Sequence, residues 1–150
     1  MFITDLSILT RYSRTFFERR LRDINIGFNE QLILQYLYKC ENVNQDTIAK
    51  HFMLDKGSIA KTLNKLEKKN LINRLDNPNN KREKLIIITK DAKKIMGQVG
   101  EELQIWHEYL FEGITKEEIA EFNRILSKMS ANAVKVIDGR SMINEDKKTG

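Results

Sequence analysis

Residues 55–70 carry side chains whose types and spacing could bind phosphate groups and the edges of nucleic-acid bases. Ile59, Leu63 and Leu66 recur at helical spacing, so they define one apolar face of a predicted helix. The opposite face carries cations and small polar groups: Gly57, Ser58, Lys61, Asn64, Lys65 and Lys68. Lysine ammonium groups neutralise phosphates, and polar side chains of a helix can reach base edges in the major groove. The same pattern is also typical of a solvated charged helix, so the neighbouring segments must decide between the two interpretations.

The ends of this helix are marked by residues that suit helix termini. Asp55 precedes it and can accept hydrogen bonds from the free N–H groups of the first turn. Asn70 follows it and tolerates the left-handed backbone conformation that ends helices. Asn44 can cap a short helix over residues 45–51. Two helices joined by the short connector 52–54 match a helix-turn-helix motif, whose second helix enters the major groove.

After residue 70 the helical spacing gives way to runs of β-branched residues. Residues 71–75 and 84–89 predict two strands. Residues 76–83 contain the only proline and three asparagines, which predicts the turn of a hairpin. Lys81 and Arg82 lie in this predicted tip, where no core requires them. A hairpin appended to a helix-turn-helix motif is a wing.

Helices are also predicted on both sides of these segments. Residues 5–24 form a helix with a broad apolar face, and a second helix over residues 30–39 can be capped by Asn29. Two later helices carry apolar seams at spacings of three and four: Met96, Val99, Leu103, Trp106 and Leu110, then Ile119, Phe122, Leu126, Met129, Ala133 and Val136. A capping box over residues 115–118 starts the last helix. Such seams suit helices paired between two chains, although an intramolecular hairpin would use the same spacing.

The charge of the chain is concentrated around the helix-turn-helix. The 150 residues carry a net charge of +5, but residues 50–94 hold 13 Lys and Arg against 5 Asp and Glu. That segment therefore has a net charge of +8 and the rest of the chain −3. A local basic patch is typical of proteins that bind the phosphate backbone. An anionic membrane is the competing partner, but the face opposite the cations offers no Trp or Phe to insert into lipid.

Other classes of protein find little support in the sequence. His51, His107 and Cys40 do not stand at metal-ligand spacing, and no phosphate loop or catalytic triad is recognisable. We therefore expect no enzyme, no metal and no cofactor. We interpret Cys40 as a buried or half-buried thiol, with redox sensing left open. A single cysteine and the lack of a secretory signal or membrane-spanning run predict a cytoplasmic protein.

Three segments together resemble the MarR (multiple-antibiotic-resistance regulator) family of winged-helix transcriptional regulators. They are Leu-Asp-Lys-Gly-Ser at 54–58, Leu-Glu-Lys-Lys-Asn-Leu-Ile at 66–72, and Asn-Lys-Arg at 80–82 followed by residues 85–89. The resemblance implies a mainly α fold with a small antiparallel β wing. The winged helix-turn-helix would span 29–89, with a helical dimerisation region over 5–25 and 90–138 and a frayed tail over 141–150. The resemblance also implies a homodimer whose recognition helix enters the major groove and whose wing arginine enters the minor groove.

The sequence departs from the family pattern at two positions. Asn70 stands where the family usually has glycine, and we expect asparagine to serve the same backbone need. Asn80 replaces the aspartate of the Asp-x-Arg pattern in the wing. Because an aspartate would orient the arginine by a charge-assisted pair, Arg82 should be held less firmly here.

From these features we expect a sequence-specific DNA-binding regulator, a ligand-responsive repressor acting as a homodimer on a pseudo-palindromic operator in double-stranded DNA. The residues predicted to contact DNA are Lys56, Gly57, Ser58, Lys61, Thr62, Asn64, Lys65, Arg74, Lys81 and Arg82. By analogy, a small aromatic effector would bind between the dimer helices and the winged domain, near Tyr12, Phe16 and His107. The alternative is a winged-helix module for protein–protein interaction without sequence-specific DNA binding.

Overall fold

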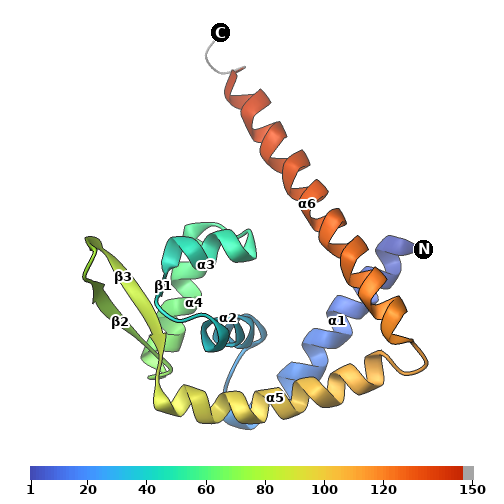
Figure 1. The fold of residues 1–150 in the computed structure, drawn as a ribbon, viewed down its shortest axis with the longest axis horizontal. Helices are drawn as coiled ribbons and strands as arrows, with labels where there is room; N and C mark the ends of the chain where they lie inside the picture. The colour runs from blue at the N-terminus through green and yellow to red at the C-terminus, as the bar shows by residue number, and fades with distance from the viewer. Residues whose placement is uncertain (147–150) are drawn as a thin grey trace. The chain divides into compact units, whose positions relative to one another are not determined.

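The computed structural model describes the backbone of residues 1–146 and side chains through residue 137, and the chain divides into two compact units. The first unit, Met1–His107, contains α1 (Phe2–Arg20), a short 3-10 helix η1 (Arg22–Ile24), α2 (Phe28–Lys39), β1 (Val43–Asn44), α3 (Gln45–Phe52), α4 (Lys56–Lys68), β2 (Ile72–Asn77), β3 (Asn80–Ile88) and most of α5 (Lys90–Leu110) (Figure 1). The second unit, Glu108–Gly150, contains α6 (Lys116–Asp146). This mainly α architecture with a small antiparallel wing confirms the predicted fold class.

The core of the first unit forms where α2, α3 and α4 pack together. Ile59, Leu63 and Leu66 of α4 are completely buried, as their helical spacing predicts. Ile48 of α3 and Leu34 of α2 are equally buried in the same cluster. Because this cluster uses the apolar face of α4, the polar face of that helix is left toward solvent.

The three strands form one antiparallel sheet in the order β1-β3-β2. Ile72 pairs with Ile88 at the base of the hairpin, and Asn77 pairs with Asn80 at its tip. The strands therefore run further toward the tip than predicted, and only Pro78 and Asn79 form the turn. Strand β1 was not predicted, because a pair of residues is too short to show alternation.

The boundaries of the first two helices differ from the prediction. α1 ends at Arg20 instead of residue 24, and the 3-10 turn that follows ends at Asn25 in the left-handed conformation. α2 begins at Phe28, and its cap is Gly27 instead of Asn29. The carboxylate of Glu30 accepts a hydrogen bond from the Gly27 N–H at 2.7 Å, so the helix starts two residues earlier than the sequence pattern suggested.

The apolar seam predicted along α5 is partly used within its own chain. Met96 and Val99 are buried in the core of the first unit, and Leu103 and Trp106 pack against it. The prediction that this seam joins two chains was therefore wrong for Met96 and Val99, which the core of their own chain buries. The physical reason is that a spacing of three and four marks any buried helix face, whichever chain covers it.

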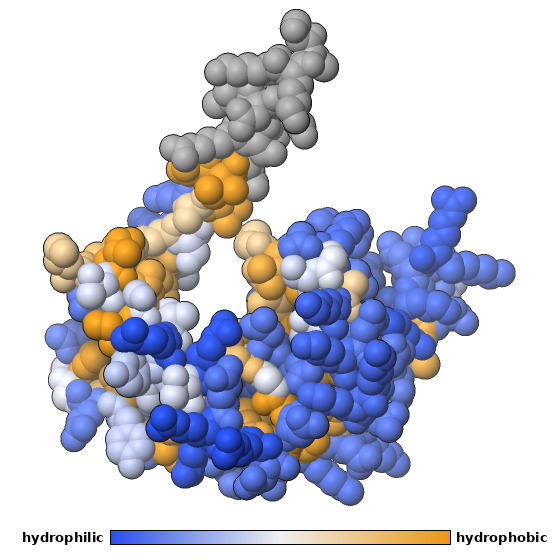
Figure 2. All heavy atoms as spheres, turned by 180° about the vertical axis from the view of Figure 1, so that it is seen from behind, coloured by the Kyte–Doolittle hydropathy of each residue, from blue (hydrophilic) through white to orange (hydrophobic). Residues whose placement is uncertain are grey.

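α6 begins as the capping box predicts and carries exposed apolar side chains. The Thr115 N–H donates to the Glu118 carboxylate at 2.8 Å, and the Glu118 N–H donates to the Thr115 hydroxyl at 3.2 Å. Apolar side chains gather on the part of α6 whose side chains are described (Figure 2). The helix includes residues 141–146, which we expected in a frayed tail, because it continues through Gly139 and no proline interrupts residues 116–146. The remaining tail residues, 147–150, lie outside the described residues.

Candidate nucleic-acid interface

Both helices of the helix-turn-helix begin at the predicted capping residues. The Asn44 side-chain oxygen accepts from the Thr47 N–H at 2.8 Å. The Asp55 carboxylate accepts from the Ser58 N–H at 2.8 Å and from the Ser58 hydroxyl at 2.5 Å. The Ser58 hydroxyl, followed by its backbone N–H, holds the pKa of Asp55 below its ordinary value. The first turn of α4 is therefore fixed by an ionised carboxylate on its exposed side.

Met53 forms the tight turn between α3 and α4 in the left-handed conformation, with φ of 51°. Glycine adopts this conformation freely, whereas another residue there costs on the order of 1–2 kcal/mol. The Leu54 N–H donates to the Ala49 carbonyl at 3.0 Å and closes the turn. The Gln45 side-chain amide donates to the Lys56 carbonyl at 3.2 Å, which ties the start of α3 to the start of α4. These contacts fix the angle at which α4 leaves the turn.

The exposed side of α4 combines free and paired cations. Lys61 and Lys65 are exposed, and no ion pair among the described residues involves either of them. Lys56 pairs with Asp46 of α3 at 2.8 Å on the surface. Lys69 instead donates to the buried Glu30 carboxylate at 2.7 Å, so this cation serves the fold. Lys61 and Lys65 are therefore well placed to meet an external phosphate, as is Lys68 at the end of α4, which is also exposed and in no ion pair among the described residues.

The other predicted α4 residues lie around these lysines. Gly57, Ser58 and Asn64 are exposed, and a Cβ at Gly57 would meet the Asp55 carboxylate at 3.1 Å. Thr62 is half-buried, and its hydroxyl donates to the Ser58 carbonyl at 3.2 Å within the same helix. Its position on the flank of the helix makes it a weaker candidate for base contact than Lys61 or Asn64.

Arg74 is held by α4 through two hydrogen bonds. Its guanidinium donates to the Glu67 carboxylate at 2.6 Å and to the Asn64 side-chain oxygen at 2.8 Å. Its side chain is half-buried, with 26% of its surface exposed. A planar guanidinium that fills two acceptors on one helix joins that helix to the strand that carries it. Arg74 therefore connects the first wing strand to the exposed face of α4.

The wing contains an irregularity that positions its cations. Asp76 pairs with Lys84 while its neighbour Asn77 pairs with Asn80, so residues 81–83 have no strand partner. Lys81 and Arg82 are exposed in this bulge, a device that redirects side chains at sheet edges. The Asn80 side-chain oxygen accepts from the backbone N–H of Arg82 at 3.1 Å. Asn80 thus orients the backbone at Arg82.

Glu83 joins the wing to the start of α3. Its carboxylate accepts from the side-chain amides of Asn44 at 3.0 Å and Asn77 at 3.4 Å. Arg74, Arg82 and Glu83 line a cavity of about 270 Å³ together with Asp46 of α3. The structure therefore brings the two predicted arginines to one hollow beside the wing, while the predicted lysines of α4 lie on the exposed helix face.

Sequence reasoning missed the carboxylates that organise this surface. Glu67 was not singled out although it anchors Arg74, and Glu83 was counted only as part of the turn. A signal for Glu67 existed, since it precedes Arg74 by seven residues across a predicted turn and has the opposite charge. The Glu83 contact depends on β1, which the sequence did not reveal.

The residues proposed for an effector lie in different surroundings. Phe16 is half-buried, with its ring centroid 4.7 Å from that of Trp106. Tyr12 is 58% exposed and lies beneath the guanidinium of Arg11. His107 is exposed and follows Trp106 at the end of the first unit. Phe16 thus belongs to an aromatic cluster that contributes to the core, and Tyr12 belongs to the surface of α1.

Cys40 and His51, the remaining candidates for redox or metal chemistry, contact other side chains of the fold. Cys40 is half-buried, as expected, and the pKa of Tyr36 is raised by burial and by the neighbouring Cys40. The His51 ring stacks on Tyr36 with centroids 4.1 Å apart. Within the part of the chain that the structure describes, no three His, Cys, Asp or Glu side chains form a group that could hold a metal ion. None of the described helices is both long and apolar enough to cross a membrane.

Comparison with known proteins identifies relatives of this fold and sequence. Residues 29–84 match the MarR family. A crystal structure of MarR is 28% identical, with a TM-score of 0.73 over 89% of this chain and 90% of that one. MepR of S. aureus, solved as a DNA complex, is 21% identical, with a TM-score of 0.80 over 88% and 98%. FabT of Streptococcus pneumoniae, also solved with DNA, is 21% identical, with a TM-score of 0.74 over 90% and 96%.

Proposed function

Since residues 29–84 carry the sequence of the MarR family and 89% of the chain adopts the fold of MarR, we propose that this protein is a sequence-specific DNA-binding transcriptional regulator. The observation that carries the proposal is the exposed face of α4, where Lys61 and Lys65 stand without ion pairs among the described residues. A rigid helix with unpaired cations beside a basic wing suits a major groove flanked by phosphates.

The contacts divide into three groups. Lys61, Asn64 and Lys65 would reach base edges or the nearest phosphates, while Lys56 and Ser58 at the start of α4 would contact the backbone. Gly57 and Thr62 would lie close to the same strand. Lys81 and Arg82 would extend from the bulge of the wing, with Arg82 in the minor groove. Arg74, which we first expected at a phosphate, is better suited to hold Asn64 and the wing in register.

We further propose that two copies act together on a pseudo-palindromic operator. In this arrangement residues 29–89 form the DNA-binding domain, and residues 5–25 and 90–138 supply the dimerisation region. Two-fold symmetry of the protein would be matched by two half-sites about one helical turn apart. Binding at a promoter would block polymerase, so we propose a cytoplasmic repressor released by a small aromatic effector near Tyr12, Phe16 and His107.

The competing function is a winged-helix module that binds another protein. A duplex selected from a random pool, followed by a salt titration, separates the two. DNA binding requires affinity to fall steeply with salt, with a slope of about −0.9 per phosphate contact, and the selected site should be an inverted repeat. If no sequence is enriched, or if the enriched duplex binds no better than a scrambled one, the protein-binding module is favoured. Small aromatic acids added to the selected complex test the effector.

A further inference from the structure

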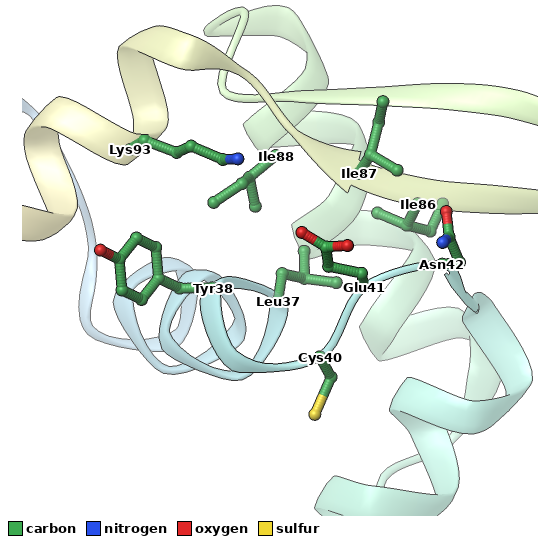
Figure 3. A pocket seen from close by; sticks show the side chains of 9 residues that line it. All are labelled: Leu37, Tyr38, Cys40, Glu41, Asn42, Ile86, Ile87, Ile88 and Lys93. Carbon is green, nitrogen blue, oxygen red and sulfur yellow. The ribbon is translucent and has the colours of Figure 1, made fainter.

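A cavity outside the proposed DNA-binding face lies at the junction of three elements. It has a volume of about 510 Å³ and is bordered by the end of α2, strand β3 and the first turn of α5 (Figure 3). This volume is within the range of about 300–1,000 Å³ that is usual for small-molecule sites. All of its lining residues belong to the first compact unit, so its shape does not depend on the placement of α6.

The lining combines two opposite charges with an apolar floor. Figure 3 shows the Glu41 carboxylate and the Lys93 ammonium extending into the same space, with Ile88 between them and Leu37 beside them. Both charged residues are exposed, and neither takes part in an ion pair among the described residues. The Tyr38 ring borders one side of the space, and the thiol of Cys40 points away from it.

This arrangement selects the charge pattern of its ligand. A simple anion would be attracted by Lys93 but repelled by Glu41, and a simple cation would meet the reverse. A molecule that carries both charges satisfies both side chains, and each contact is a charge-assisted hydrogen bond. An apolar part of the same molecule would cover the half-buried Ile88 and the exposed ring of Tyr38, and would remove part of their surface from water.

We propose that this cavity binds a free amino acid with an apolar side chain. Its carboxylate pairs with Lys93, its ammonium pairs with Glu41, and its side chain lies on Ile88 beside the ring of Tyr38. The binding does not depend on the proposed DNA-binding function, because none of these residues belongs to the predicted DNA-contacting set. The two proposals can therefore fail separately.

Calorimetric titration of the full chain with matched ligands tests the charge pattern. L-phenylalanine and L-leucine should bind saturably at millimolar concentrations or below. 3-Phenylpropionate, which lacks the ammonium, and phenethylamine, which lacks the carboxylate, should each bind about tenfold more weakly than phenylalanine. If neither amino acid binds saturably, or if either single-charge analogue binds as well as phenylalanine, the proposal is wrong.

Two charge-neutral variants assign the contacts. Glu41→Gln should weaken phenylalanine binding about tenfold and leave 3-phenylpropionate binding unchanged or stronger. Lys93→Gln should weaken phenylalanine binding similarly and leave phenethylamine binding unchanged or stronger. Lys90→Gln, one turn earlier on α5 and outside the cavity lining, is the matched control and should bind phenylalanine like the wild type. Since Glu41 and Lys93 are exposed, we expect both variants to melt at the same temperature as the wild type. Equal phenylalanine binding by all three variants would overturn the assignment.

Discussion

Two arginines of the wing have the same chemistry but different surroundings. The guanidinium of Arg74 is used by the protein itself, since it donates to Glu67 and Asn64 on α4. Arg82 is exposed in a bulge and is fixed through its backbone N–H, which donates to Asn80. A side chain already bound to two acceptors is suited to positioning its neighbours, and an exposed one is suited to reaching a ligand. The two residues should therefore respond differently to the same substitution.

Arg74→Ala should lower operator affinity about tenfold while leaving the salt dependence of binding nearly unchanged. Loss of a phosphate contact reduces the slope of log affinity against log salt by about 1, whereas loss of a positioning contact does not. The measurement is a salt titration of wild type and variant on one operator. A slope reduced by a full phosphate equivalent would place Arg74 at the DNA backbone and contradict the positioning role.

Arg82→Ala should weaken operator binding by about 1 kcal/mol, the low end of the range for an arginine contact, because no carboxylate among the described residues forms an ion pair with its guanidinium. The loss should be larger on operators with A·T-rich flanks, whose narrow minor groove has the stronger negative potential. Lys81→Ala removes the same charge from the adjacent residue and should weaken both kinds of operator equally. Equal losses for Arg82→Ala on both flanks would remove the minor-groove contact from the mechanism.

Asp55→Ala should lower the melting temperature near pH 7, and its difference from the wild type should shrink as the pH falls below the ordinary pKa of aspartate. The Ser58 hydrogen bonds hold the folded-state pKa of Asp55 below its ordinary value. The stabilisation from this carboxylate is therefore present above the ordinary pKa and is lost as the pH falls through the lower folded value. Thermal melts of wild type and variant across this interval measure the difference. A gap between the two curves that stays constant into acid would show that the charge of Asp55 is irrelevant to the cap.

Among the elements, helix α4 has one face that packs in the core and an opposite face that is proposed to bind DNA. Lys61→Ala combined with Lys65→Ala should leave the melting temperature nearly unchanged, because Ile59, Leu63 and Leu66 on the other face make the core contacts. The same double variant should abolish specific operator binding. Footprinting checks the result, with Lys116→Ala plus Lys128→Ala as a control that removes equal charge from α6. A retained operator footprint would show that another element enters the major groove.

The helix-turn-helix was predictable because its signals are local. Asn44 and Asp55 cap their helices through their own first turns, and the stripe from Ile59 to Leu66 needs only helical spacing. The boundaries that were missed depend on side chains elsewhere. α2 starts early because Glu30 reaches back to Gly27, and Glu30 is itself held by Lys69, which follows the end of α4. Lys69 lies 39 residues after Glu30, so the sequence around residue 28 could not indicate this second contact.

The candidate site was predictable in its residues but not in their roles. The sequence predicted cations on α4 and in the wing, because residue type and spacing can be read from it directly. The opposite charge of Glu67 seven residues before Arg74 was a signal, but it did not establish their contact, because that contact requires the register of β2 against α4. Nor could the sequence show the bulge at residues 81–83, which appears only when the pairing of Asn77 with Asn80 is known. The sequence pattern does not predict which residues of separate helices and strands contact one another.

At the scale of the whole molecule, the two units differ in what covers their apolar surfaces. The first unit buries a continuous core that includes Met96 and Val99 of α5. In α6, by contrast, Phe122 is 45% exposed and Val136 is 54% exposed. Single exposed apolar residues are ordinary, but a row of them at spacings of three and four along a helix favours a protein partner. α1 also exposes Ile3 and Leu6, so apolar surface is available in both regions assigned to dimerisation.

Leu126→Arg should convert the proposed dimer to a monomer. Leu126 lies in the row between Phe122 and Met129, and an arginine there would place an unpaired charge where two chains meet. Sedimentation of the wild type at micromolar concentration should show a mass near twice 17.6 kDa, and the variant should show a mass near 17.6 kDa with weaker operator binding. Ser127→Arg adds the same charge one residue further along, on an exposed position outside the row, and should remain dimeric. A wild-type monomer that binds the operator tightly would contradict the two-fold arrangement, and a dimeric Leu126→Arg variant would move the interface away from this row.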